Sequence, residues 1–382
     1  MELVFWVSAG LVLYVYAGYP LLLALVGAFL RGRPVRDGAE TPQVTLIVSA
    51  YNEAGVIGEK LANSLSLDYP ASQLEVLVVS DCSSDDTDAI VRVCGDARVR
   101  LLRMSERGGK TVGLNAAVRD ARGEILVFSD ANALYFKDAL RMLTRNFADP
   151  RIGAAVGEST YSEAEAGADE HESLYWRYEV LIKRFESLIG STVGGDGAIY
   201  AIRKSLYRPM RADALSDFVN PLQIVQSGYR CVYEPEAKSI ERAAGDFDRE
   251  FRRKVRIVNR GWRALMSLRA LLNPFRFGFF SLQIFSHKVL RWLVPAFLFI
   301  CLVSNALLLG RGWVYSATFA AQVALYLLAA IGYALRRRPN LSRVLGIPLY
   351  FVMVNLASAR GIVEAYFGKT YTTWATARQT ES

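Results

Sequence analysis

Hydrophobic and polar positions divide the chain into long apolar runs near its two ends and a mixed region between them. No charged residue occurs between Glu2 and Arg31. The apolar run over 3–30 exceeds the roughly 20 residues that a helix needs to cross a bilayer, and it exceeds the apolar core of a signal peptide, about 7 to 15 residues. We therefore expect a retained transmembrane anchor over residues 1–31.

Three further apolar runs lie toward the other end of the chain. Residues 292–310 and 312–335 carry no charge, and each run is long enough to span a bilayer. Residues 344–359 fall short of that length and contain a proline and an asparagine, so this run crosses, re-enters or lies along the membrane surface. We expect a membrane region over 288–364 with two or three spans, followed by a tail over 365–382.

Arginine residues are distributed unevenly around these runs. A group of them follows the first run and another follows the run that ends at residue 335, whereas Arg311 stands alone between the second and third runs. Because basic residues collect on the cytoplasmic side, we expect the N-terminus outside and residues 32–287 in the cytosol. Arginine far outnumbers lysine, which favours a bacterial source with GC-rich DNA and hence the inner membrane for this multi-pass protein.

The region between the membrane runs alternates short strand-like runs with helical patterns. The strand-like runs are almost continuously apolar, which indicates a parallel sheet covered by helices on both faces. The predicted strands are 44–50, 74–80, 99–104 and 124–129. We expect an α/β domain of Rossmann type over residues 42–248, and in such sheets ligands bind beyond the carboxyl ends of the strands.

Polar residues follow each predicted strand. Taken alone, each group has an ordinary explanation as a helix cap or a turn. Together they suit one nucleoside diphosphate: Asp81 can accept the imide N–H of a uracil-like base, Lys110 can offset phosphate charge, and Asp130 can hold a divalent cation. A Walker-type phosphate loop is disfavoured, because Met104 occupies the position that would need glycine five residues before Gly109.

Composition excludes several other classes of chemistry. The chain has 382 residues, 45 Lys and Arg against 37 Asp and Glu, two histidines and four cysteines. Two distant histidines and the absence of any CxxC disfavour a zinc site or a His-based nucleophile relay. The basic residues gather beside the membrane runs and not on a soluble face with interleaved aromatics, so we expect no nucleic-acid partner.

One amphipathic stretch links the sheet domain to the membrane region. Apolar residues recur at Phe251, Val255, Val258, Trp262 and Leu265, a helical spacing, among seven basic residues. This pattern is typical of a helix that lies on anionic membrane lipid. We therefore expect amphipathic interface helices over residues 249–287.

Several of these motifs resemble those of a known family. Tyr51-Asn52-Glu53, the Asp-x-Ser-x-Asp that begins at Asp81, Lys110 with Asn115, and Asp130-x-Asn132 resemble the nucleotide-sugar half of a family 2 glycosyltransferase with the GT-A fold. The acceptor half of the family is similar to three further segments: 194–203, 216–217 and 233–237. The flanking runs resemble the membrane-embedded branch, which includes bacterial exopolysaccharide, cellulose, chitin-oligosaccharide and hyaluronan synthases.

The resemblance implies roles for the donor-side residues. By the resemblance, the donor nucleotide sugar would be bound by Tyr51, Asn52, Glu53, Asp81, Ser83, Lys110 and Asn115, with residues 51–53 and Asp81 on base and ribose. Asp130 would ligate Mg²⁺ or Mn²⁺. Asn132 stands where the family has a second carboxylate, so it would offer a carbonyl oxygen without negative charge.

The resemblance also implies roles on the acceptor side. Asp217 would be the general base that takes the proton from the attacking hydroxyl; a helix cap is its alternative role. The acceptor would lie near Gly195, Asp196 and Gly197. An in-line displacement with inversion at the anomeric carbon would follow.

A further motif bears on repeated addition to one growing chain. Processive members of the family carry Gln-x-x-Arg-Trp, whereas this chain lacks the Gln and has Gly261 between Arg260 and Trp262. By the resemblance Arg260 would contact the diphosphate and Trp262 would support the acceptor sugar. A Trp on an apolar stripe also serves as an interface anchor. The motif therefore leaves processivity open.

The resulting hypothesis is an inverting, metal-dependent transferase at the cytoplasmic membrane face. It would move a sugar from a nucleotide sugar, with a UDP sugar favoured, to a cell-surface polysaccharide or a lipid-linked glycan acceptor. Two alternatives remain. One is a processive synthase that also translocates its polymer, with a homo-oligomer or an export partner supplying the rest of the channel. The other is a catalytically idle subunit that senses a nucleotide sugar in an export assembly.

Overall fold

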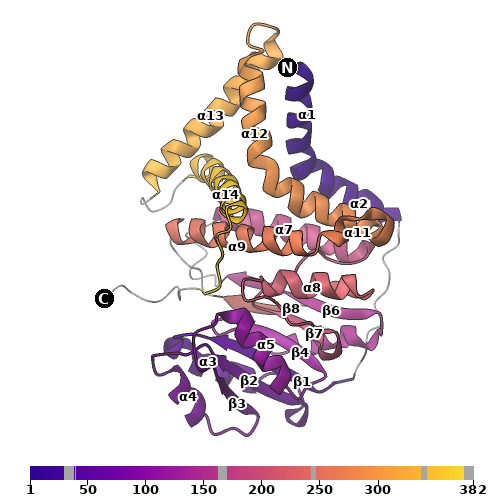
Figure 1. Ribbon diagram of the computed structural model, residues 1–382, viewed down its shortest axis with the longest axis vertical. Coiled ribbons are helices and arrows are strands. Elements are labelled where there is room, and N and C mark those ends of the chain that lie inside the picture. Colours follow the sequence, from indigo (N-terminus) through magenta and orange to yellow (C-terminus); the bar gives the residue numbers. More distant parts are fainter. Residues whose placement is uncertain (30–37, 39, 162–169, 242–246, 337–341, 374–382) are drawn as a thin grey trace.

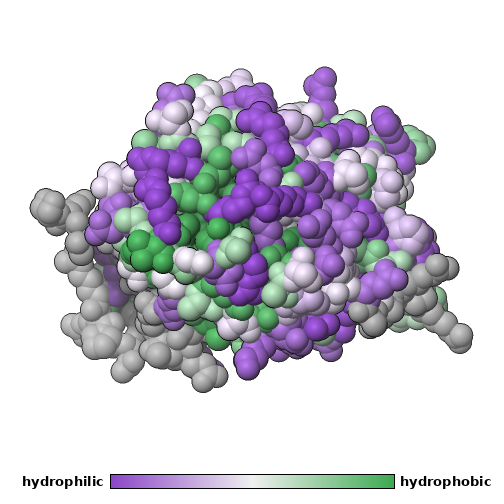
Figure 2. All heavy atoms as spheres, turned by 90° about the horizontal axis from the view of Figure 1, so that it is seen from below, coloured by the Kyte–Doolittle hydropathy of each residue, from purple (hydrophilic) through white to green (hydrophobic). Residues whose placement is uncertain are grey.

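The protein consists of a sheet domain and a group of long apolar helices on one side of it (Figure 1). The computed structural model describes residues 1–29, 38, 40–161, 170–241, 247–336 and 342–373. Figure 2 shows that the face turned away from the long helices is largely hydrophilic, with hydrophobic side chains gathered in one area.

One sheet of eight strands forms the domain, in the order β3-β2-β1-β4-β7-β6-β8-β5. Its first half is parallel and consists of β1 (Val44–Ala50), β2 (Leu74–Ser80), β3 (Val99–Arg103) and β4 (Ile125–Asp130). Every residue of β1 and β2 is buried, which explains why these runs are apolar without alternation. The helices that connect these strands are α3 (Ala54–Leu65), α4 (Thr87–Val93) and α5 (Lys110–Asp120). The four predicted strands are confirmed, with small shifts at their ends.

The second half of the sheet is mixed. It consists of β5 (Leu134–Tyr135), β6 (Ile152–Tyr161), β7 (Tyr200–Arg203) and β8 (Arg230–Glu241). β7 pairs antiparallel with both β4 and β6, whereas β6 and β8 are parallel. The parallel-sheet prediction concerned only the four strands of the first half, which are parallel. The strands of this mixed half were not predicted, because a short strand such as β7 carries little hydrophobic pattern. The intervening elements are α6 (Ala139–Arg145), α7 (Glu170–Ile189) and α8 (Ser216–Gln226), with short 3-10 helices at Asn146–Ala148 and Lys204–Leu206. Another 3-10 helix, Ala71–Gln73, precedes β2 in the first half.

Four helices in the described residues are long and apolar enough to cross a membrane: Glu2–Phe29, Phe279–Ala306, Trp313–Leu335 and Arg343–Tyr366. The first and third agree with the predicted runs. The second starts at Phe279 instead of Trp292, because three basic side chains interrupted the apolar pattern. The fourth is one continuous helix that extends beyond the predicted run at both ends. Their segments are α1 (Glu2–Leu13), η1 (Tyr14–Gly18), α2 (Tyr19–Phe29), α11 (Phe279–Ile284), η7 (Phe285–Leu290), α12 (Arg291–Ala306), α13 (Trp313–Leu335) and α14 (Arg343–Tyr366).

Helices α7 and α9 (Phe247–Ser267) lie between the sheet domain and the long helices (Figure 1). The apolar stripe of α9 is covered by protein, because Val255, Val258 and Leu265 are buried and a Cβ added at Gly361 of α14 would come within 2.8 Å of the Val255 carbonyl oxygen. The part of the stripe formed by Val255 and Val258 therefore packs against α14. Short helices η6 (Arg269–Leu272) and α10 (Pro274–Phe277) complete this layer.

Candidate active site

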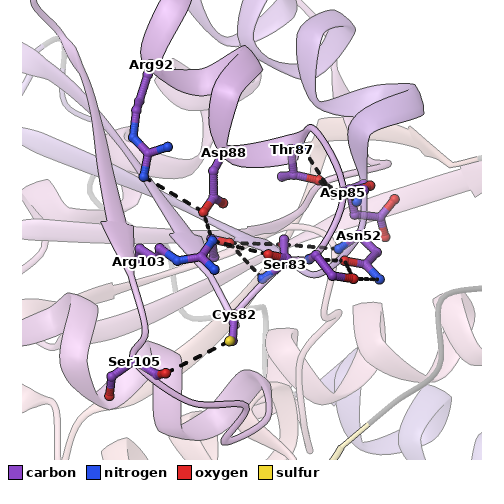
Figure 3. Close-up of polar contacts among 12 residues, drawn as sticks. Asn52, Cys82, Ser83, Asp85, Thr87, Asp88, Arg92, Arg103 and Ser105 are labelled. Atoms are coloured by element: carbon purple, nitrogen blue, oxygen red, sulfur yellow. Dashed lines mark hydrogen bonds and ion pairs between the residues drawn. The ribbon is translucent and has the colours of Figure 1, made fainter.

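The loops after β1 and β2 are bonded to each other, as Figure 3 shows. The Asn52 amide N–H donates to Ser83 Oγ at 3.1 Å, and the Ser84 N–H donates to Asn52 Oδ1 at 2.8 Å. The Glu53 N–H donates to Thr87 Oγ1 at 2.8 Å. Asn52 has φ +52°, a conformation that asparagine tolerates better than most residues. The first two predicted donor motifs therefore form one surface at the carboxyl edge of the parallel strands.

Asp81 connects this surface to the start of α5. Its buried carboxylate accepts the backbone N–H of Gly108 at 2.8 Å and that of Gly109 at 2.9 Å. These two bonds hold the turn from which Lys110 begins the helix. Beside this turn, the Arg107 guanidinium lies 3.8 Å from the centre of the Tyr51 ring. The predicted donor residues Tyr51, Asp81 and Lys110 thus share one loop region.

Lys110, Asp130 and Asp217 converge on Gly197. Lys110 Nζ forms an ion pair with Asp130 and lies 3.4 Å from the Gly197 carbonyl oxygen. A Cβ built on Gly197 would lie 3.7 Å from Asp217 Cγ, 3.7 Å from Lys110 Nζ and 3.8 Å from Asp130 Oδ2. Residues from α5, β4, α8 and the loop before β7 therefore face one space, and the absence of a side chain at Gly197 keeps that space open.

We expect Gly197→Ala to lower turnover strongly without unfolding the protein. The new methyl group would stand at van der Waals distance from all three functional side chains, where reacting atoms must fit. Because displacements of about 1 Å at a reacting centre can cost about 10²-fold in rate, we expect a loss of at least that order. Nucleoside diphosphate release and thermal unfolding would be measured together. Gly10→Ala, at a position with no atom within 4 Å of the added Cβ, is the control.

Asp217 has the electrostatic environment of a base. It lies in the first turn of α8, half-buried, and its backbone oxygen accepts the Gly195 N–H at 2.6 Å. Burial raises the pKa of Asp217 above its ordinary value, with Lys110 opposing the shift and Asp196 adding to it. A carboxylate with a raised pKa holds a proton more strongly, which suits proton abstraction.

This shift predicts a pH dependence. A base must be ionised to act, so the transfer rate is expected to fall as the pH is lowered through the pKa of folded Asp217. Because that pKa is raised, the acid limb of kcat/KM should lie above the ordinary aspartate value of about 3.9. A limb at or below about pH 4 would contradict the assignment.

Negative charge is concentrated beside Asp130, as a cation site requires. Among the described residues, Asp196 Oδ2 is buried without a hydrogen-bond partner. Burial, reinforced by Asp130 and Asp196, raises the pKa of Glu241 to about 8. No group of three or more His, Cys, Asp or Glu side chains in the described segments has the arrangement of a complete metal centre. Carboxylate and amide oxygens are the ligands that a hard divalent cation prefers, so Asp130, Asn132 and the Asp196 oxygen that lacks a hydrogen-bond partner suit such a cation by their chemistry. The ligand roles of Asp130 and Asn132 stay predictions.

Three predicted site residues hold elements of the fold together. Asn115 Nδ2 donates to the Met210 carbonyl oxygen at 2.7 Å, and its Oδ1 accepts the Tyr207 hydroxyl at 2.6 Å. Arg260 Nε donates to the Asp213 carbonyl oxygen at 3.1 Å. Trp262 packs against Trp292, with ring centres 6.3 Å apart. Their roles toward donor or acceptor stay predictions.

Sequence reasoning missed two contributors to the site. Glu241 ends β8, a strand that the pattern analysis did not recognise, although its position at a strand end could have marked it. The other is the segment after α14: a Cβ added at Gly109 would lie 2.1 Å from the Thr372 carbonyl oxygen. The chain near Thr372 therefore reaches the donor loop, and this long-range contact left no local pattern. Residues 374–382 of the predicted tail lie outside the described residues.

Residues 45–208 match the model of Glycosyl transferase family 2. The chain contains a glycosyl transferase family 2 domain. This match confirms the family resemblance, and it covers the donor motifs together with Gly195, Asp196 and Gly197, whereas Asp217 lies beyond it.

Two curated relatives are similar to parts of the chain. The beta-monoglucosyldiacylglycerol synthase of Synechocystis is 38% identical over 117 residues, which is 30% of this chain and 24% of the relative. The poly-beta-1,6-N-acetyl-D-glucosamine synthase of Staphylococcus aureus is 25% identical over 215 residues, 54% of this chain and 52% of the relative. The chain thus spans about a quarter and about half of these relatives' lengths.

Almost the whole chain is similar to the solved structure of a mannosyltransferase. The mannosyltransferase PcManGT from Pyrobaculum calidifontis, in complex with GDP-Man and Mn²⁺, superimposes with a TM-score of 0.73 at 24% identity, over 96% of this chain and 99% of that one. The likeness confirms a GT-A-like fold with long apolar helices toward both ends of the chain.

Proposed function

We propose that the protein is an inverting, metal-dependent hexosyltransferase that moves a sugar from a nucleotide sugar to a membrane-associated acceptor. The convergence of Lys110, Asp130 and Asp217 on Gly197 carries this proposal. It gathers one cationic group, one cation-binding carboxylate and one base around a space that no side chain fills. The bonded donor loops after β1 and β2 end at the same edge of the sheet.

In the mechanism, residues 51–53 and Asp81 bind the base and ribose of the donor, and Ser83 belongs to the same donor site. Asp130 and Asn132 would hold Mg²⁺ or Mn²⁺, which supplies positive charge to the departing diphosphate. Lys110, which pairs with Asp130, is close enough to contribute its charge to the same phosphates. A preorganised charge of this kind acts without reorienting during the reaction.

Asp217 acts on the other reactant. An acceptor hydroxyl attacks the anomeric carbon from the face opposite the diphosphate, and its proton passes to the Asp217 carboxylate. The bond from the anomeric carbon to the diphosphate oxygen breaks, so the nucleoside diphosphate leaves with the bonding electrons. One displacement inverts the configuration, and no enzyme nucleophile is required.

The position of the domain supports an acceptor at the membrane. The layer of α7 and α9 lies directly between the sheet domain and the four long apolar helices (Figure 1). The names of the two relatives give a glycolipid and a polysaccharide as their products, and both classes of product support a lipid or glycan acceptor for this chain. We propose the cytoplasmic face of a bacterial inner membrane, a UDP sugar as donor, and anionic lipid beside the basic residues of α9.

The test presents the purified full-length protein with a panel of nucleotide sugars, Mg²⁺ or Mn²⁺, and a membrane lipid extract. Nucleoside diphosphate release and the masses of the products are measured. One added sugar per acceptor supports the proposal as stated, and a ladder of products supports the processive alternative. No release from any donor would reject transfer and favour the idle nucleotide-sugar sensor.

A further inference from the structure

A buried carboxylate near the end of α7 connects the membrane helices to the candidate active site. Glu186 is fully buried, with 0% of its surface exposed. Its Oε1 accepts the Tyr19 hydroxyl at 2.6 Å and lies 2.8 Å from His287 Nδ1. Its Oε2 accepts the Val193 N–H at 2.9 Å. One carboxylate therefore joins three segments that are far apart in the sequence.

Two of the three segments belong to helices that are long and apolar enough to span a membrane. Tyr19 opens α2 and His287 lies in η7. His287 Nε2 is also 3.1 Å from Glu179 Oε2, and Glu179 pairs with Arg291. Glu179 lies about two helix turns before Glu186 on α7. We call Tyr19, Glu179, Glu186, His287 and Arg291 the α7 network. Each of its members is at least nine-tenths buried.

The third segment leads directly into the site. Val193 is followed by Gly194, with φ +92°, and by Gly195, whose N–H donates to the Asp217 carbonyl oxygen at 2.6 Å. Gly197, four residues after Val193, faces Lys110, Asp130 and Asp217. Because a single residue separates Val193 from Gly195, a shift at Val193 is expected to reach the bond between the Gly195 N–H and the Asp217 carbonyl oxygen.

The chemistry of the network argues for more than packing. Burying charges is costly, and apolar side chains of similar volume would often stabilise a fold as well or better. Here each oxygen of Glu186 serves a different purpose: one bonds the membrane helices and the other bonds the active-site loop. Because one carboxylate bonds to both sides, a change in the position of α2 or η7 is passed to the loop. Hydrogen bonds to a charged group fix the direction of such a contact, whereas an apolar contact does so less strictly.

We propose that Glu186 is a positioning residue through which two membrane helices hold the 193–197 loop, and with it the Asp217 base, in register with the acceptor. This rests on the proposed function. The donor loops around Asn52, Ser83 and Asp81 are bonded independently of the α7 network. Loss of the connection should therefore affect the acceptor reaction and leave donor binding intact.

The test uses the full-length protein in lipid nanodiscs and compares Glu186→Gln with the wild type. We expect faster amide hydrogen exchange over residues 193–197, and a loss of kcat/KM for the acceptor on the order of 10²-fold, as for a misplaced reacting group. The KM for the nucleotide sugar should stay within about twofold of the wild-type value, because the substitution leaves the donor site unchanged. Tyr19→Phe removes one of the two contacts between the membrane helices and Glu186 and leaves the His287 contact, so it should change the same quantities in the same direction by a smaller amount.

Glu75→Gln is the matched control. Glu75 is a buried carboxylate of β2 that accepts Thr45 Oγ1 at 2.6 Å and the Arg122 N–H at 2.9 Å, in the sheet and away from the α7 network. It should lower stability without changing exchange at 193–197. If Glu186→Gln or Tyr19→Phe leaves that exchange at the level of Glu75→Gln, the proposal is overturned. Exchange needs no substrate, so this outcome is distinct from a wild type that transfers no sugar.

Discussion

Asp217→Asn is expected to retain nucleotide binding and lose turnover. The amide keeps the size of the side chain but cannot take a proton from the acceptor hydroxyl. General-base assistance is typically worth about 10² to 10⁴ in rate, and we expect a loss in that range. Transfer to the acceptor and binding of the nucleoside diphosphate, by calorimetry, would be measured on the same preparation.

The segment itself offers a control for Asp217→Asn. Asp213, four residues earlier, is buried and forms ion pairs with Arg211 and Arg263, whose side chains are more exposed. Asp213→Asn should lower the stability of the fold and leave the transfer rate near that of the wild type. If Asp217→Asn instead transfers sugar at a rate within a few-fold of the wild type, Asp217 is not the base. Its role would then be to stabilise the start of α8.

Asp130→Ala is expected to produce the other large effect, through the leaving group. Asp130 is the carboxylate that faces Lys110 and Gly197, and its removal takes the predicted cation ligand out of the site. Charge stabilisation by a bound metal is worth several kcal/mol, so we expect a loss of about 10³-fold or more. Mn²⁺ titrations of nucleoside diphosphate release should show saturation for the wild type and none for the variant.

Asp149→Asn provides a comparison for this experiment. Asp149 is buried at 1% exposure and is paired with Arg151 in the turn before β6. This variant should lose stability while its dependence on Mn²⁺ stays that of the wild type. An Asp130→Ala protein with an unchanged Mn²⁺ requirement would show that the cation is held elsewhere.

Much of the donor half could be predicted from local patterns. The strands 44–50 and 74–80 were found to the residue, because burial on both faces makes such strands continuously apolar. Since parallel strands end at one edge, the residues after them were expected to lie together, and Asn52, Ser83 and Asp81 do so. These inferences need only the period of the pattern and the direction of the strands.

Less of the acceptor half could be predicted from local sequence patterns. β7 has only four residues, too few for a hydrophobic pattern to identify the strand. Its antiparallel pairing with β4 is visible only in the structure. The stripe of α9 was read as a lipid-facing surface, yet Val255 and Val258 pack against α14. An apolar helix face looks the same in sequence whether lipid or another helix covers it.

By itself, the sequence determined the α/β class, the parallel strands, the carboxylates at their ends and three of the long apolar helices. Only the tertiary structure decided that the second of these helices begins at Phe279, with His287 and Arg291 inside it. An analysis of local hydropathy ends an apolar run where a charged residue occurs. Burying a charged side chain is costly unless an oppositely charged partner is present. Their partners, Glu179 and Glu186, lie about a hundred residues earlier on α7. Pairing at that separation exists only in the folded chain.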